Sequence, residues 1–300
     1  MSEPTAYGGQ AVIEGVVIRG RRTIALACRR PNGEIYRYRE VLDSPLQRSR
    51  LAKLPFVRGV VVLWESLSFG MKMLMRSADI QLESPDGPAA GDAKLGTGGS
   101  SGLMLVSVGA ALLIFIGVPY LLTQLLHALI TSSLLLNIAE GVVRMGLFVG
   151  YLFLISLLPD IRRVFAYHGA EHMTIHAFEH GDPLDAAHIE PYPTAHPRCG
   201  TAFLLFVVVI AIVLFAFIPR VNLLVDLVAR LLLVVPVAAI AYEVLKLGAR
   251  HERNPLMRLA VAPGLLLQAI TTRRPDAGMI EVAVASLEEA LAGDAPAAAA

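Results

Sequence analysis

Four of the chain's eight histidines fall at every fourth residue of the segment AYHGAEHMTIHAFEHG, residues 166–181. Because an α-helix has about 3.6 residues per turn, residues four apart lie on nearly the same face. The spacing therefore predicts a helix that carries a stripe of imidazoles along one side. Neutral imidazole is a common ligand of zinc and other divalent transition metals, so this stripe is a candidate metal site. The four residues are His168, His172, His176 and His180.

The first part of the stripe matches the pattern H-x-x-E-H, with Glu171 directly before His172. Imidazoles at positions i and i+4 can share one zinc ion, and the intervening glutamate can reach a water on the metal as a general base. One ion cannot take all four histidines, because His168 and His180 would lie about 18 Å apart along a straight helix. Further ligands must therefore come from elsewhere in the chain.

The nearest supply of further ligands is the segment TAHPRCGT, residues 194–201, in which His196 and Cys199 are three residues apart. Imidazole and thiolate are both good zinc ligands, and we expect this proline-containing loop to fold back onto the stripe.

Glu243 is a second candidate ligand, because it lies within a long apolar run. Burying an acidic side chain in such a run costs free energy unless the side chain is paired or binds a metal. The alternative is an ion pair across one helical turn, with Lys246 or Arg250.

Three other interpretations of these residues stay open. The stripe could be an interfacial helix whose histidines hydrogen-bond lipid phosphates or carbonyls. Cys199 could be a small buried residue at the start of a helix, or a nucleophile whose thiol pKa is lowered by the helix N-terminus and by Arg198, with a nearby histidine activating it.

The composition excludes an ordinary soluble domain. The chain has 300 residues, of which 55% are hydrophobic and 17% charged, and its mean hydropathy is +0.60. A soluble protein can bury one helix of this character, but four apolar runs of membrane-spanning length in one chain predict a protein of about four transmembrane helices in a lipid bilayer. These runs are Leu103–Leu126, Ile138–Leu158, Thr201–Ile218 and Val221–Leu247.

The distribution of basic residues predicts the orientation. Arginine and lysine gather before the first run, between the second and third, and after the fourth, whereas the two remaining linkers contain Arg220 alone. The positive-inside rule therefore places both termini and the loop 159–200, with its histidines, in the cytoplasm. The polar start of the chain predicts no cleavable signal peptide, and two distant cysteines, Cys28 and Cys199, predict reduced thiols rather than a disulfide framework. No nucleic-acid partner is predicted.

The predicted fold class is a mainly α-helical polytopic membrane protein with a small N-terminal β-meander and cytoplasmic amphipathic helices. The meander covers residues 8–40 and contains a β-prone run from Gln10 to Ile18, and Pro55–Arg76 is expected to be an interfacial helix. The predicted parts are a cytoplasmic region 1–83, a flexible linker 84–102, a four-span core 103–248 and a cytoplasmic tail 249–300.

The segment YGGQAVIEGVVIRGRR, residues 7–22, holds several glycines, Gln10 and the single acid Glu14 in a β-like run. The glycines indicate either backbone packed closely against another group or ordinary strand and turn architecture.

Within the apolar runs, two acid–arginine combinations occur at a spacing of four residues. Glu140 with Arg144, and Asp226 with Arg230, are each predicted to pair on one helix face.

Five segments together resemble the YqhQ-like family of bacterial membrane proteins, which have a domain of unknown function and are described as predicted metal-dependent enzymes. The resemblance covers nearly the whole chain and implies a location in the bacterial cytoplasmic membrane. One departure is Met173, where the family pattern leads us to expect lysine; it lies off the His168 and His172 face. The segments are GGQAVIEGVVIRG, YHGAEHMTIHAFEHG, HPRCGT, PGLLLQAITTRRPD and IEVAVASLE.

The family pattern marks residues in three of these segments. They are Gly8, Gly9, Gln10, Glu14 and Gly15, then His168, Glu171, His172, His176 and His180, and then His196, Pro197, Arg198 and Cys199.

These observations predict a metal-dependent membrane enzyme, with zinc as the expected metal and hydrolysis as the expected chemistry, acting at the cytoplasmic membrane face. His168 and His172 are the expected ligands, completed by His196, Cys199 or His176, with Glu171 as the base. The alternative is a non-enzymatic scaffold or assembly factor, whose metal is structural and whose basic N-terminal region docks a membrane or cytoplasmic protein. A closed ligand shell that includes Cys199 would favour this alternative.

Overall fold

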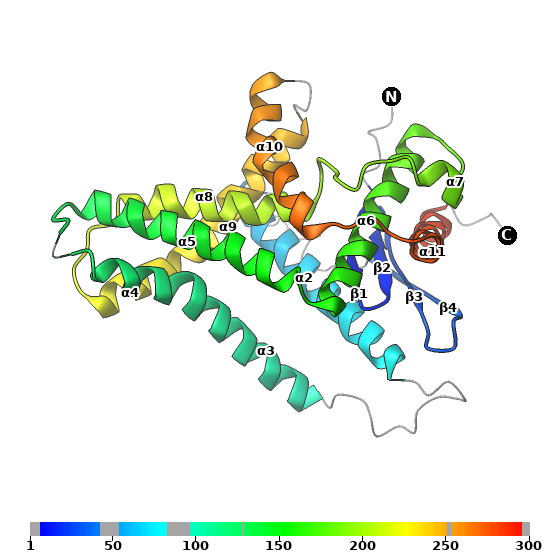
Figure 1. The fold of residues 1–300 in the computed structure, drawn as a ribbon, viewed down its shortest axis with the longest axis horizontal. Coiled ribbons are helices and arrows are strands. Elements are labelled where there is room, and N and C mark those ends of the chain that lie inside the picture. Colours follow the sequence, from blue (N-terminus) through cyan, green and yellow to red (C-terminus); the bar gives the residue numbers. More distant parts are fainter. Residues whose placement is uncertain (1–6, 43–53, 83–96, 128, 251–253, 296–300) are drawn as a thin grey trace.

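The structure is a computed structural model, and it describes residues 7–42, 54–82, 97–127, 129–250 and 254–295. Most of these residues are helical, and one small β-sheet lies at one end of the molecule (Figure 1). The predicted linker 84–102 falls mostly outside the described residues.

The sheet is an antiparallel meander in the order β1-β2-β3-β4, which confirms the predicted N-terminal meander. The predicted run from Gln10 to Ile18 is not one strand, because the chain turns at Glu14, whose φ angle is 50°. Val12 and Gly15 close this tight hairpin as register partners. The strands are β1 (Gly8–Val12), β2 (Gly15–Arg19), β3 (Thr23–Arg29) and β4 (Ile35–Val41).

Helices cover both faces of the sheet. Side chains alternate between the faces of a strand, so a strand that is buried throughout must be covered on both sides. Val16 and Ala27 pack against α6 (Pro159–His180) and α11 (Ala277–Asp294), whereas Val17 and Leu26 pack against α2 (Val57–Gln81). The described parts of the N-terminal region and the C-terminal tail therefore pack around one core with the histidine helix.

The other end of the molecule is a helical bundle in which α4, α5, α8 and α9 lie side by side (Figure 1). Its first helical stretch is continuous through a π-helical segment. The remaining helices are α7 and α10, which lie close to α6 and to α8 respectively. The bounds are α3 (Thr97–Leu112), η2 (Leu113–Gly117), α4 (Val118–Gln124), α5 (Ser133–Ile155), α7 (Ala186–Ile189), α8 (Gly200–Ala216), α9 (Leu223–Arg250) and α10 (Pro255–Thr271).

Among the described residues, three helical stretches are long and apolar enough to cross a membrane: Leu105–Gln124, Ser133–Ile155 and Leu223–Gly248. Many of their large apolar side chains are exposed, which indicates a lipid bilayer environment. The predicted third span forms α8, whose 17 residues reach about 26 Å against a hydrocarbon core of about 30 Å. The count of four spans therefore stays a prediction.

The buried carboxylate of Glu140 pairs with several arginines of the bundle. Arg144 donates to Glu140 at 2.6 Å, which confirms the predicted pair one turn apart. The second predicted pair, Asp226 with Arg230, is wrong. The Arg230 guanidinium donates to the Glu140 carboxylate at 2.7 Å, and its bond to Asp226 is to the backbone carbonyl and not to the carboxylate. The Asp226 carboxylate accepts from the Tyr120 hydroxyl instead, at 2.6 Å. Contact between α5 and α9 offers these buried charges better partners than their own helices do.

Candidate metal centre

The helix predicted for the histidine stripe is α6. It starts with Pro159 in its first turn and ends at Gly181, whose φ angle of 77° is the left-handed conformation that favours glycine after a helix. Its central part is buried between the sheet, α11 and the loop that precedes α8. The stripe therefore lies inside the protein along most of its length, and only His180, in the last turn, is exposed.

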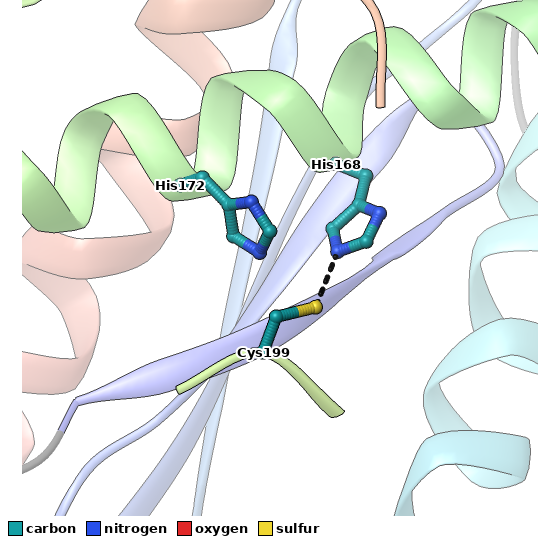
Figure 2. A group of neighbouring side chains, drawn as sticks. All are labelled: His168, His172 and Cys199. Carbon is teal, nitrogen blue, oxygen red and sulfur yellow. Dashed lines mark hydrogen bonds between the residues drawn. The ribbon is translucent and has the colours of Figure 1, made fainter. Parts of the chain in front are cut away.

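His168 and His172 lie on adjacent turns of α6, with ring centroids 4.3 Å apart, and Cys199 faces them from the start of α8 (Figure 2). The Nε2 atom of His168 is 3.3 Å from the Cys199 sulfur. One ligand atom from each of the three residues lies within 4.8 Å of the others. In the part of the chain that the structure describes, these three form the group of histidine, cysteine and acidic side chains close enough to hold a metal ion.

Backbone carbonyls orient both imidazoles. The Nδ1 atom of His168 lies 2.9 Å from the carbonyl oxygen of Thr271, and Nδ1 of His172 lies 2.6 Å from that of Thr194. A carbonyl can only accept, so each Nδ1 carries a proton, and in the neutral ring Nε2 is the nitrogen that can bind a metal. A second hydrogen bond of this kind is what fixes the tautomer and the ring orientation of metal-binding histidines.

The segment after α10, which follows the Thr271 carbonyl, crosses α6 at Gly169. Arg273 donates its backbone N–H to the carbonyl of Phe165 at 2.8 Å, and a Cβ atom at position 169 would clash with the Arg273 carbonyl. Glycine within the H-x-x-E-H segment therefore allows the crossing that orients His168.

The loop that carries Cys199 is held by α10. The side-chain amide of Gln268, which is fully buried, accepts from the backbone N–H of His196 at 2.8 Å and donates to its carbonyl at 3.0 Å. The Thr272 hydroxyl donates to that of Thr194 at 3.1 Å. Gln268, Thr271 and Thr272 lie in the segment PGLLLQAITTRRPD that carries the family resemblance. No role was predicted for them, because a backbone carbonyl or a single glutamine matches no metal-binding pattern.

Glu171 is buried beside this group. Its Oε1 accepts from the backbone N–H of Gly9 at 2.9 Å, and its Oε2 is 3.4 Å from Nε2 of His172. Burial raises the pKa of Glu171 to about 7, although His168 and the Gly9 hydrogen bond act in the opposite direction. The glycines of residues 7–22 indicated either closely packed backbone or ordinary strand architecture, and Gly9 is a case of close packing. Its backbone contacts Glu171 directly, and an added Cβ would clash with Val17.

His176 and His196 form a second pair next to the first, with ring centroids 4.5 Å apart. Nε2 of His176 lies 2.9 Å from the carbonyl of Ala195, so it is a donor and not a ligand atom in this arrangement. Burial lowers the pKa of both imidazoles, that of His196 to about 3. Of the three residues predicted to complete the ligand set, Cys199 has a ligand atom within 4.8 Å of those of both His168 and His172. The His196 ring lies next to His172 as well, with the ring centroids 5.7 Å apart.

The other residues predicted for the site lie outside the three-residue group. The carboxylate of Glu179 pairs with Arg198 and lies 3.5 Å from Nε2 of His196. Nδ1 of His180 donates to the carbonyl of His176 at 2.8 Å. Gln10 packs against α2 at Gly70, where an added Cβ would lie 2.6 Å from its amide nitrogen.

Glu243 is also outside the group, so its prediction as a ligand is not supported. Its carboxylate accepts from the Arg58 guanidinium, with Nε at 2.8 Å, and from the backbone N–H of Phe56 at 3.2 Å. These partners come from α2 and the residue before it, and the alternative ion pair with Lys246 or Arg250 stays a prediction.

Glu14 joins the β1–β2 turn to α6. Its two carboxylate oxygens accept from Arg163 at 2.5 and 2.6 Å, and the Tyr167 hydroxyl donates to it at 3.2 Å. The hydrogen bond from Arg163 lowers the pKa of Glu14, with burial acting against it.

We expect Glu14→Gln to lower the free energy of unfolding by about 1 kcal/mol, because the pair is partly exposed and solvent screens it. Denaturant unfolding in detergent, followed through the sheet signal in circular dichroism, measures this. In an Arg163→Gln background the same change should cost clearly less. An equal loss in both backgrounds would contradict a direct interaction.

Comparison with known proteins supports a family assignment. The sequence pattern of the family described as "Protein of unknown function (DUF1385)" matches residues 54–293. The chain is 31% identical over 295 residues to the "Uncharacterized protein YqhQ" of Bacillus subtilis (strain 168), covering 96% of this chain and 93% of the relative. No solved structure matches.

Proposed function

The chain belongs to the DUF1385 family, and from that premise we propose that it is a metal-dependent membrane enzyme with a zinc site formed by His168, His172 and Cys199. One observation carries the proposal: a ring nitrogen of each histidine and the Cys199 sulfur lie within 4.8 Å of one another, and the Nδ1 atom of each imidazole is held by a backbone carbonyl. Two imidazoles and a thiolate are a ligand set that zinc accepts.

The number of ligands favours catalysis over a structural role. Structural zinc is almost always held by four protein ligands, whereas catalytic zinc keeps three and an open position. The group found within the described residues has three members. Zinc bound there would supply a Lewis acid and lower the pKa of a coordinated water, which suits hydrolysis. The scaffold with a structural metal is the alternative, and it would need a fourth protein ligand.

Glu171 is the proposed general base. It follows the H-x-x-E-H pattern, and its Oε2 lies 3.4 Å from Nε2 of His172. The Gly9 N–H holds its other oxygen, so the carboxylate is fixed in place before any substrate binds. In this role Glu171 accepts a proton from the attacking water and returns it to the leaving group.

A second candidate function rests on the contact between Cys199 and His168. The thiol lies 3.3 Å from the imidazole and at the N-terminus of α8, where the backbone N–H of Thr201 donates to it at 3.4 Å. A cysteine beside a histidine and at the N-terminus of a helix is a common arrangement for covalent catalysis. In that case Cys199 attacks the substrate itself and no metal is needed.

Cobalt substitution tests the two candidates against each other. We expect the cobalt-loaded protein to absorb in the near ultraviolet through thiolate-to-metal charge transfer, and we expect Cys199→Ser to remove that absorption. The control is Cys28→Ser, which changes a buried residue of β3 and should leave the absorption intact. A protein that binds no metal, while iodoacetamide rapidly modifies Cys199, would favour the thiol mechanism.

The proposal includes the membrane in which the protein lies and the side on which its site faces. The basic residues before the first apolar run and around the loop 159–200 support a cytoplasmic site in a bacterial inner membrane. The bilayer is the expected partner, and a membrane or cytoplasmic protein is the partner that the scaffold alternative requires.

A further inference from the structure

Helix α2 has two different faces. One face is buried against the sheet through residues such as Met73 and Ile80. Another face, in the first half of the helix, exposes large apolar side chains. Trp64 is 64% exposed and Leu67 is 59% exposed, and Val57 and Val60 are exposed beside them. These four residues, which we call the α2 stripe, are spaced three, four and three residues apart, so they lie along one side of the helix.

The α2 stripe lies next to the end of a membrane-spanning helix. Arg58, one residue into the stripe, pairs with Glu243 of α9, and an added Cβ at Gly59 would lie 2.9 Å from the Tyr242 ring. Both α9 residues are within the last turns of the candidate span Leu223–Gly248. Figure 1 shows α2 running from this part of α9 to the sheet.

The length of α9 places this contact at the membrane boundary. A helix of 26 residues is about 39 Å long, and the hydrocarbon core is about 30 Å thick, so its last turns enter the headgroup region. Val244 and Leu247, in those turns, are exposed as well. The α2 stripe therefore continues the apolar surface that α9 presents to lipid.

We propose that the α2 stripe binds the lipid bilayer at the membrane–water interface, with the Trp64 indole at the level of the headgroups. Tryptophan is enriched at this level because its ring is apolar while its N–H can bond to water or to a headgroup. The opposite face of α2 holds the sheet through Gly70 and Gln10, and the adjacent Gly9 contacts Glu171. A bilayer that binds α2 would therefore help to hold β1, whose Gly9 N–H positions the carboxylate of Glu171.

The contact is mainly apolar. Arg58 and Lys72, basic residues of α2 near the stripe, are paired with Glu243 and Glu40, so they add little attraction to anionic headgroups. Arg19 lies beside the stripe as well, where it donates to the neutral hydroxyl of Ser66 at 3.1 Å. We therefore expect the contact to form in zwitterionic bilayers, with anionic lipid adding a small, salt-sensitive contribution.

The experiment uses the chain's one tryptophan. The full-length protein is reconstituted in phosphatidylcholine nanodiscs that contain lipids brominated either near the headgroup or deep in the acyl chain. We expect strong quenching of Trp64 fluorescence by shallow bromines, weaker quenching by deep bromines, and little quenching by iodide in the aqueous phase. Adding phosphatidylglycerol should not change this order.

The matched control moves the fluorophore to the β3–β4 hairpin, which lies near the C-terminal end of α2, whereas the stripe is in its first half. In the double variant Trp64→Phe, Glu34→Trp, the indole replaces an exposed residue between β3 and β4, and it should be quenched by iodide and not by brominated lipid. Iodide quenching of Trp64 comparable to that of the control would overturn the proposal. So would protection of Trp64 from both quenchers, because that result would mean that another protein surface covers the stripe.

Discussion

Replacing either His168 or His172 by alanine is expected to remove most of the zinc from the purified protein, and the double replacement is expected to remove little more. The two imidazoles share one proposed ion, so loss of either leaves a site with two protein ligands, which holds zinc far more weakly. In a site where the ligands act jointly, single and double changes have nearly the same effect. Metal analysis of the protein after gel filtration in detergent measures the zinc content per chain.

A histidine outside the site provides the control. His188 is exposed in α7 and its Nδ1 lies 2.8 Å from Asp185, so His188→Ala should keep its zinc. Equal zinc in the double variant and in the unaltered protein would show that the metal is bound elsewhere. Retained circular dichroism and an unchanged elution volume are required for each variant, so that a loss of zinc is not confused with a loss of fold.

The histidine helix and the group of three ligand atoms were within reach of the sequence because they depend on local geometry and on ligand chemistry. A spacing of four residues puts His168 and His172 on one helix face in any context. Cys199 lies in a proline-containing loop directly before an apolar helix, so the sequence already indicated that it could lie close to the histidine helix. Which of Cys199 and His196 lies nearer to both His168 and His172 was beyond the sequence, because both side chains face α6 and their positions depend on a loop that Gln268 of α10 holds.

Partners that are distant in the chain were not predicted. Arg230 was predicted to pair with Asp226 on its own helix, and that was wrong, because it pairs with Glu140 of α5. Glu243 was predicted to bind the metal or to pair on its own helix, and the structure adds Arg58 of α2 as its partner. A buried charge takes the partner that tertiary packing brings to it, and periodicity within one segment cannot show which helices will touch. The same limit applies to the sheet: the meander follows from its turns, but not its burial between α2, α6 and α11.

Glu171→Gln separates an enzyme from a scaffold. The amide has the shape of the carboxylate, and its oxygen can still accept the hydrogen bond from the Gly9 N–H, so fold and membrane insertion should be unchanged. What the amide lacks is the ability to take a proton from water. Where general-base assistance is lost, rates fall typically by about 10²-fold or more. We therefore expect the variant to keep its zinc and to fail to restore the phenotype of a deletion strain when expressed at the native level.

The comparison variant is Glu190→Gln, an exposed residue at the end of α7, which should restore the phenotype fully. If Glu171→Gln also restores it fully, the scaffold with a structural metal is the better interpretation, because an amide can maintain a hydrogen bond beside a metal ligand. Loss of function together with loss of zinc would contradict the assignment of Glu171 as a base and make it part of the metal site. The 3.4 Å separation between Oε2 of Glu171 and Nε2 of His172, with the other oxygen held by β1, favours loss of function with zinc retained.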